Sequence, residues 1–108
     1  MNFEIAPKET EVELSWNEAM MYCFSVNIDG KTGWRLPSKD ELHQIWKSTN
    51  DFAESNYYWS STECEDDSYY MWCKFFEYDV FDDTDGDCAY SKDYDEYGGH
   101  RVRAVRTI

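Results

Sequence analysis

The chain has 108 residues and a formal net charge of −13, with 23 acidic side chains against ten lysines and arginines. This charge argues against direct binding to nucleic acid or to an anionic membrane, because both carry the same sign. Aromatic residues make up 19% of the chain, which excludes a disordered acidic tail. We therefore expect one folded domain over residues 1–108.

Two helices are predicted in the first half of the chain. Ser15 is followed three residues later by Glu18, the pattern of a capping box, and apolar residues then recur at helical spacing. These apolar residues are Trp16, Ala19, Met20 and Cys23. Ser38 and Glu41 repeat the capping pattern, so a second helix should begin at Ser38 and end near residues 48–50. Its apolar face consists of Leu42, Ile45 and Trp46.

The remaining segments are typical of strands and turns. Residues 57–62, 69–81, 88–90 and 101–108 are rich in aromatic and β-branched side chains, and the stretches between them are rich in Asp, Ser and Gly. Residues 34–37, Trp-Arg-Leu-Pro, should also be extended, because proline disfavours helical backbone in the residue before it. Two helices followed by strands predict the α+β class with an antiparallel sheet.

The N-terminus and the cysteines indicate a cellular compartment. The first 14 residues show neither the basic region nor the apolar stretch of a secretory signal, and no run of 18 apolar residues occurs. We expect a cytoplasmic protein with reduced, mostly buried thiols. Their spacing fits no zinc motif, and we expect no cofactor. The four cysteines are Cys23, Cys64, Cys73 and Cys88.

Carboxylates and tyrosines gather between residues 63 and 97, which carry a net charge of −11. Alternate residues on one face of a strand are about 6.6 Å apart, so a sheet face and its turns can imitate the charge density of a duplex, which has a phosphate about every 1.7 Å of axis. Interleaved tyrosines would serve as rigid anchors. The alternative is that the acidic residues have no binding role and only keep the protein soluble. The candidate partner-binding residues are Glu63, Glu65, Asp66, Asp67, Tyr69, Tyr70, Tyr78, Asp82, Asp83, Asp85 and Asp87.

Calcium binding and catalysis find little support in the motifs. Setting Gly86 at position 6 of an EF-hand loop leaves Phe81 at position 1 and Lys92 at position 12, where acidic ligands are needed. No nucleophile elbow, phosphate loop or metalloprotease motif is present. His43 fits a helix surface, and His100 has no recognisable nucleophile beside it. We expect no enzymatic activity and no metal site.

Four motifs together carry a family resemblance. The succession WNEAMMYC, GWRLPSKDEL, YYWSSTE and RVRAVR, from about Ser15 to Arg106, resembles the bacterial Lcl C-terminal domain, a compact relative of the C-type-lectin fold. The resemblance implies two helices packed on a curved antiparallel sheet, with the N- and C-terminal strands adjacent. Family members occur as secreted adhesive modules and as stand-alone proteins of bacteria and their phages.

The resemblance also suggests roles for single residues. Trp34, Leu36 and Pro37 look like core and turn, Arg35 like a partner of carboxylates or carbonyls, and Trp59, Ser60 and Ser61 like a strand whose hydroxyls satisfy the backbone. Arg101, Arg103 and Arg106 should bridge to the acidic half, because interior strands rarely leave arginines unpaired. Secreted members often bond the cysteine of the first helix to one in the last strand, where this chain has Ala104, so Cys23 lacks that partner.

These observations support a hypothesis of a non-enzymatic interaction module: a phage-encoded inhibitor whose acidic, nucleic-acid-mimicking surface blocks a basic host protein that handles nucleic acid or serves in defence. The alternative is a lectin-like domain for carbohydrate binding or adhesion, and a third possibility is an assembly component. Binding by a mimic should weaken steeply with salt, whereas a sugar site should respond to calcium or free sugar. Glycosaminoglycans, bound by secreted relatives, should be repelled.

Overall fold

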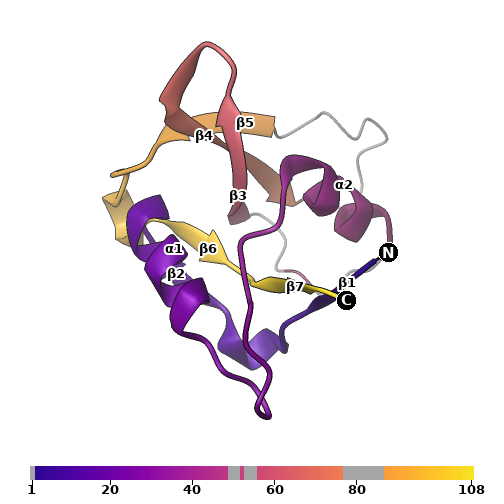
Figure 1. Ribbon diagram of the computed structural model, residues 1–108. Coiled ribbons are helices and arrows are strands. Elements are labelled where there is room, and N and C mark those ends of the chain that lie inside the picture. Colours follow the sequence, from indigo (N-terminus) through magenta and orange to yellow (C-terminus); the bar gives the residue numbers. More distant parts are fainter. Residues whose placement is uncertain (1, 49–51, 53–55, 77–86) are drawn as a thin grey trace.

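The computed structural model describes residues 2–48, 52, 56–76 and 87–108, without the side chains of residues 87 and 88. Its helices are α1 (Trp16–Ser25), α2 (Lys39–Ser48) and the short 3-10 turns η1 (Lys8–Thr10) and η2 (Glu96–Gly98). The strands are β1 (Phe3–Ile5), β2 (Val12–Leu14), β3 (Asn56–Cys64), β4 (Asp67–Phe76), β5 (Asp87–Ser91), β6 (His100–Val102) and β7 (Val105–Thr107) (Figure 1). The α+β class is confirmed. No helix within these ranges is long and apolar enough to cross a membrane.

The two ends of the chain lie side by side, as expected (Figure 1). Strand β1 pairs antiparallel with β7, so that Phe3 lies opposite Thr107 and Ile5 opposite Val105. The extended segment around Arg35 joins on the other side of β7, since the backbone amides of Arg35 and Val105 each donate to the other residue's carbonyl at 2.8 Å. Three segments distant in sequence thereby fasten the termini together.

The larger sheet has five strands in the order β2-β6-β3-β4-β5. Three of its pairings are antiparallel, but β3 and β6 run parallel where Tyr58 lies opposite Arg101. The expectation of a purely antiparallel sheet is wrong at this pairing, because the chain crosses back through residues 92–99 before β6 enters beside β3. The sheet is therefore mixed.

The expected strand at 101–108 is divided between the two sheets. Strand β6 ends at Val102 and β7 begins at Val105. Between them the buried Arg103 donates from Nε to the Ala6 carbonyl at 2.7 Å, and the Ala6 amide donates to the Ala104 carbonyl at 2.9 Å. These bonds satisfy the backbone where the chain changes sheet.

Helix α1 begins at the predicted cap. The Ser15 hydroxyl accepts from the Glu18 amide at 3.3 Å, and the Glu18 carboxylate accepts from the Ser15 amide at 3.3 Å. Ala19 and Cys23, one turn apart, are buried. Met20, which shares their helical spacing, is 40% exposed, because the helix turns about 100° per residue and its contact with the rest of the fold is a narrow stripe.

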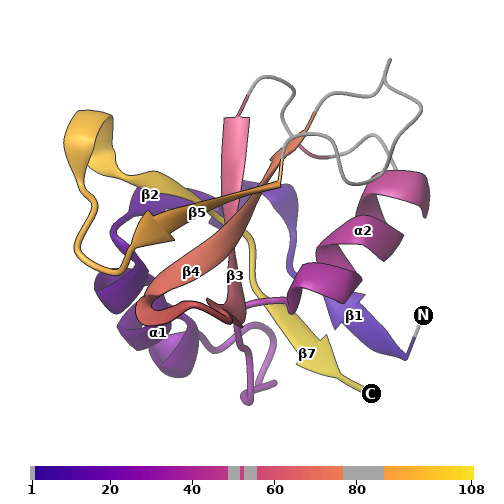
Figure 2. The ribbon, with the colours of Figure 1, turned by 90° about the horizontal axis from the view of Figure 1, so that it is seen from above.

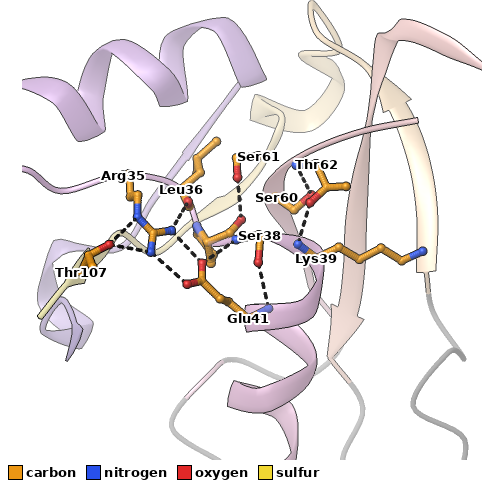
Figure 3. Close-up of polar contacts among 10 residues, drawn as sticks. Arg35, Leu36, Ser38, Lys39, Glu41, Ser60, Ser61, Thr62 and Thr107 are labelled. Atoms are coloured by element: carbon orange, nitrogen blue, oxygen red, sulfur yellow. Dashed lines mark hydrogen bonds and ion pairs between the residues drawn. The ribbon is translucent and has the colours of Figure 1, made fainter. Parts of the chain in front are cut away.

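Helix α2 begins with a second capping box, which also holds the Arg35 side chain (Figure 3). The Glu41 carboxylate accepts from the Ser38 amide at 2.8 Å, and the Ser38 hydroxyl accepts from the Glu41 amide at 3.1 Å. The same carboxylate accepts hydrogen bonds from both terminal nitrogens of Arg35, at 2.7 and 2.9 Å. Arg35 also donates to the Leu36 carbonyl and to Thr107 Oγ1, which confirms its predicted pairing.

The hydroxyls that follow Trp59 also act as predicted. Ser60 Oγ donates to the Trp72 carbonyl at 2.7 Å and accepts from the Thr62 amide at 3.1 Å. Ser61 reaches the Pro37 carbonyl through its amide at 2.9 Å and its hydroxyl at 3.5 Å (Figure 3). These bonds tie β3 to the turn before α2.

The core has two parts, one that includes residues of α1 and one that includes residues of α2. The two helices lie apart, with β3 between them (Figure 2). One part contains Trp34, Leu36 and Trp59, as expected. Cys23 and Ala104 belong to the same cluster, and burial raises the pKa of the Cys23 thiol to about 11. The position implied to bear a partner cysteine therefore contributes a methyl group to the core, and Cys23 is a free thiol.

Candidate functional site

The acidic residues of the first predicted turn form the tip of a β-hairpin. Strands β3 and β4 are joined by a two-residue turn, Glu65 and Asp66, with Cys64 paired to Asp67. The register shifts on either side of Glu63, so the strand bulges just before the turn. We call this tip the acidic hairpin, and it comprises Glu63, Glu65, Asp66, Asp67, Tyr69 and Tyr70, all of them exposed.

The hairpin tip is held by its own side chains. Trp72 donates from Nε1 to Glu65 Oε2 at 3.1 Å, and Lys39 Nζ lies 3.8 Å from the centroid of the Trp72 ring. A hydrogen bond from its own backbone amide, the Trp72 bond and the Lys39 charge lower the pKa of Glu65. Asp67 Oδ1 accepts from the Tyr69 amide at 2.9 Å. The carboxylates therefore stand on an ordered support.

Both tyrosines of the acidic hairpin face solvent. Tyr69 is 47% and Tyr70 40% exposed, with ring centroids 6.3 Å apart in an edge-to-face arrangement. Strand alternation predicts that one of two consecutive residues faces the core, but the first four residues of β4 are exposed, and burial starts at Met71. A hydrogen bond to Asp93 raises the pKa of Tyr69 and lowers that of Asp93. The hairpin thus projects beyond the core with rings on both sides.

The second predicted turn is largely outside the described residues. Tyr78, Asp82, Asp83 and Asp85 all lie there. Asp87 opens β5 opposite Lys74 of β4, and its side chain is not described. A shared face for the two turns stays a prediction.

The three C-terminal arginines contact carboxylates near the N-terminus. Arg101 lies opposite Glu13 in the β2–β6 register, and their side chains approach to 3.7 Å. Arg106 lies opposite Glu4 in the β1–β7 register, at 2.9 Å. The predicted bridges to the acidic half were therefore wrong for these ion pairs: strand pairing sets the partners.

Glu11 occupies the centre of this arrangement. Its carboxylate, only 5% exposed, lies 3.6 Å from Arg101 and 3.7 Å from Arg103, and it accepts a short hydrogen bond from the Tyr58 hydroxyl. For the ion pairs of Glu4 and Glu13, the available sequence signal was the repeated strand pattern apolar-Glu-apolar in Phe3–Ile5 and Val12–Leu14.

The ion pairs of the described residues gather around carboxylates in the first 41 residues. The described ion pairs place Lys31, Arg35 and the three C-terminal arginines on Glu4, Glu11, Glu13 and Glu41. Within the part of the chain that the structure describes, Glu63, Asp66 and Asp67 make no ion pair. The acidic hairpin is left with an uncompensated negative charge.

The surroundings of His100 were not predicted from the sequence. The ring of His100 is packed among four aromatic rings, with centroid distances of 5.1 Å to Tyr57, 4.8 Å to Trp59, 4.3 Å to Tyr90 and 4.8 Å to Tyr94. Burial lowers its pKa from the ordinary 6.5 to about 4, so the imidazole is neutral at pH 7. His100 is therefore an uncharged member of an aromatic cluster.

Beside this cluster opens a pocket with a cavity volume of about 300 Å³. We call it the tyrosine pocket; its lining includes Tyr57, Tyr94, Tyr97, His100, Glu13, Glu96 and Arg101. These residues come from three stretches of the chain that are distant in sequence, so no local motif predicts the pocket. The Gly-Gly pair before His100 was the one local signal of a close backbone approach.

The described side chains offer little for metal chemistry. Nowhere in residues 2–48, 52, 56–76 and 87–108 do three His, Cys, Asp or Glu side chains come together as ligands of one ion. Most of the aspartate-rich turn considered for calcium lies outside these ranges. The described residues present two surface features, a charged hairpin tip and an aromatic pocket.

Comparison with known proteins agrees with the fold. Residues 4–106 match the family described as the Lcl C-terminal domain, whose members are lectin-like modules with a C-type-lectin-like fold. A search of the curated proteins finds no match to the chain. The match covers nearly the whole length, together with the paired terminal strands and the two capped helices. The chain belongs to the Lcl C-terminal domain family.

Proposed function

We propose that this chain is a non-enzymatic interaction module whose acidic hairpin binds a basic surface on another protein. The observation that carries the proposal is the separation of charge. The C-terminal arginines are held by the carboxylates of β1, β2 and the segment between them, whereas Glu63, Asp66 and Asp67 are exposed and make no ion pair among the described residues. A surface with uncompensated charge attracts a partner of opposite charge and speeds its association.

The finer form of the proposal is an inhibitor that imitates nucleic acid, encoded by a phage and directed at a host protein that handles nucleic acid or serves in defence. Four carboxylates fall within the five residues 63–67, next to two exposed tyrosine rings. A basic groove built for phosphates and stacked bases would find both features on this hairpin.

The test is capture of partners from a bacterial lysate with matched variants. The hairpin variant E63Q/E65Q/D66N/D67N keeps the shape of every side chain and removes four charges. The control variant E9Q/E18Q/D29N/D40N removes the same number of charges from exposed positions elsewhere. We expect wild type and control to retain one dominant basic protein at low salt and to release it at high salt, and the hairpin variant to lose it.

Three outcomes would contradict the proposal. Equal loss in both variants would mean that net charge, and not the hairpin, holds the partner. Full retention by the hairpin variant would remove these residues from the interaction. Capture of no protein by wild type at either salt would leave the acids as aids to solubility and direct attention to glycans.

A further inference from the structure

The tyrosine pocket shares no lining residue with the acidic hairpin. It is lined by residues of β2, β3 and β6 and of the segment 94–99. Its aromatic lining consists of Tyr57, Tyr94 and Tyr97. Glu13 and Glu96 bring two carboxylates to the same lining. Its volume of about 300 Å³ is at the lower end for sites that bind small ligands.

The backbone at the pocket is strained and closely packed. Tyr97 has φ = 54°, in the left-handed region that non-glycine residues rarely adopt, and its ring is 95% exposed. Gly99 has φ = 91°, and a Cβ added there would lie 2.1 Å from the Leu14 carbonyl oxygen. The chain thus presses against β2 while Tyr97 is held out beside the pocket. Strain that presents an exposed ring suggests a use for the ring.

The pocket residues also include unusual polar groups. Among the described residues, two buried side-chain polar atoms have no hydrogen-bond partner, His100 Nε2 and Arg101 Nε. Both belong to residues that line the tyrosine pocket. Such atoms are rare in folded proteins. Both are already buried, so they mark the floor of the pocket as unusual and are not themselves contacts for a ligand.

The charges favour a cationic ligand. Arg101 is already offset by Glu11 at 3.6 Å and Glu13 at 3.7 Å, whereas Glu96 makes no ion pair among the described residues. The chain as a whole carries −13. A planar cation would find aromatic faces and a free carboxylate together at this place.

The same molecule already stacks cations on rings elsewhere. Lys39, Lys74 and Lys92 lie over tryptophan rings at 3.8 to 4.9 Å from the ring centroids, and Arg103 lies over Phe52 at 4.8 Å. The Tyr97 ring has no such cation among the described residues.

We propose that the tyrosine pocket binds the side chain of an arginine supplied by the partner protein, with its guanidinium stacked against Tyr94 and Tyr97 and hydrogen-bonded to Glu96. An arginine fits better than a lysine, because the guanidinium is planar, weakly hydrated and able to stack while it donates in its own plane. The inference rests on the proposed function in that the partner is basic, and it assigns one arginine of that partner to a defined pocket.

The experiment uses a small probe and needs no partner. N-acetyl-arginine amide is titrated into the protein while the ring signals of His100 and the tyrosines are followed by NMR. N-acetyl-citrulline amide, which replaces the guanidinium by a neutral group of the same shape, is the matched ligand control. We expect saturable shifts with the arginine compound and none with the citrulline compound.

Variants then locate the site. Y97A and E96Q should each weaken arginine binding by roughly 3- to 30-fold, the range of a single desolvated cation–π or charge contact. Tyr97 is 95% exposed, so its removal should leave the fold intact. F24A removes an aromatic ring that is 90% exposed on α1, outside both the pocket and the acidic hairpin, and should leave arginine binding unchanged.

Several results would overturn this inference. These are the absence of a saturable shift, equal shifts from citrulline, unchanged binding in both Y97A and E96Q, or equal shifts from a neutral monosaccharide, which would make the pocket a carbohydrate site. Failure here is distinguishable from failure of the proposed function. Y97A and E96Q retain the acidic hairpin and its partner, and the hairpin variant E63Q/E65Q/D66N/D67N should still bind the arginine compound.

Discussion

The Glu41 side chain makes two structural contacts at once. Glu41 completes the capping box of α2 and also accepts two hydrogen bonds from Arg35, which in turn reaches Thr107 of the C-terminal strand. The Arg35 bonds lower the pKa of Glu41, so the carboxylate stays ionised well below neutral pH. One carboxylate thus links a helix start to the paired termini.

Replacement of Glu41 by alanine should therefore cost more than an ordinary surface change. E41A leaves the Ser38 amide and the Arg35 guanidinium without their acceptor, and we expect a loss of about 2 kcal/mol in the free energy of unfolding. D40A, an exposed acid in the same helical turn, is the control and should stay within about 0.5 kcal/mol. Urea unfolding measures both, and equal values would show that the Arg35 contact contributes nothing.

His100 gives the molecule a pH dependence of a particular sign. Its pKa is about 4 in the folded protein and near 6.5 when exposed, so the unfolded chain binds the proton more readily. Stability due to the neutral imidazole is complete above pH 6.5 and is lost as the pH falls from 6.5 toward 4. The uncharged rings of Tyr57, Trp59, Tyr90 and Tyr94 surround the imidazole.

H100F keeps an aromatic ring in the cluster and removes the titration. Wild type should lose about 2 kcal/mol of unfolding free energy between pH 7 and pH 4.5 through this group, after allowance for partial solvent screening. H100F should lack that part of the loss. Urea midpoints across this pH range provide the measurement, and parallel curves for the two proteins would mean that His100 is not the responsible group.

At the scale of elements, η2 and the turn into β6 create the tyrosine pocket by a close approach to β2. Gly99 permits that approach, because any Cβ there would overlap the Leu14 carbonyl. Gly33 has a similar positive φ of 84° but nothing within 4 Å of an added Cβ. Alanine at either position would adopt an unfavourable positive φ, but only alanine at position 99 would also collide with a neighbouring strand.

G99A should destabilise the fold by roughly 3 kcal/mol or more, or prevent folding, whereas G33A should cost about 1–2 kcal/mol. The difference between the two, measured by urea unfolding, reports the collision with β2. G99A as mild as G33A would mean that η2 can move away from β2, and that the pocket is not a fixed feature.

Elements set by local chemistry were predictable, and those set by pairing were not. The two helix starts follow from Ser15 with Glu18 and Ser38 with Glu41, patterns contained in four residues each. The three-residue strands β1 and β2 are too short for a reliable periodic signal. Their pairing with β7 and β6 decides which carboxylates meet the arginines, and that information is not local.

The candidate site shows the same division. The turn at Glu65 and Asp66 follows from composition, and its exposure was expected. The outward position of both Tyr69 and Tyr70 was not, since alternation alone cannot tell where a hairpin leaves the core. The tyrosine pocket needs side chains from three distant stretches of the chain to be brought together, so only the three-dimensional fold reveals it.

At the scale of the whole molecule, the distribution of charge matters more than its sum. Strand pairing places the C-terminal arginines beside carboxylates near the N-terminus, whereas Glu63, Asp66 and Asp67 make no ion pair among the described residues. The fold is that of a lectin-like module, and its family membership alone does not name a ligand. The proposed function therefore depends on whether the acidic hairpin contacts a basic protein.

The salt dependence of partner binding is the measurement that decides whether the acidic hairpin is the interface. The affinity of the captured partner would be measured over a range of salt concentrations for wild type, for E63Q/E65Q/D66N/D67N and for E9Q/E18Q/D29N/D40N. We predict a steep loss of affinity with salt for wild type and the control variant, and a weaker, flatter dependence for the hairpin variant. An unchanged slope and affinity in the hairpin variant would contradict the account.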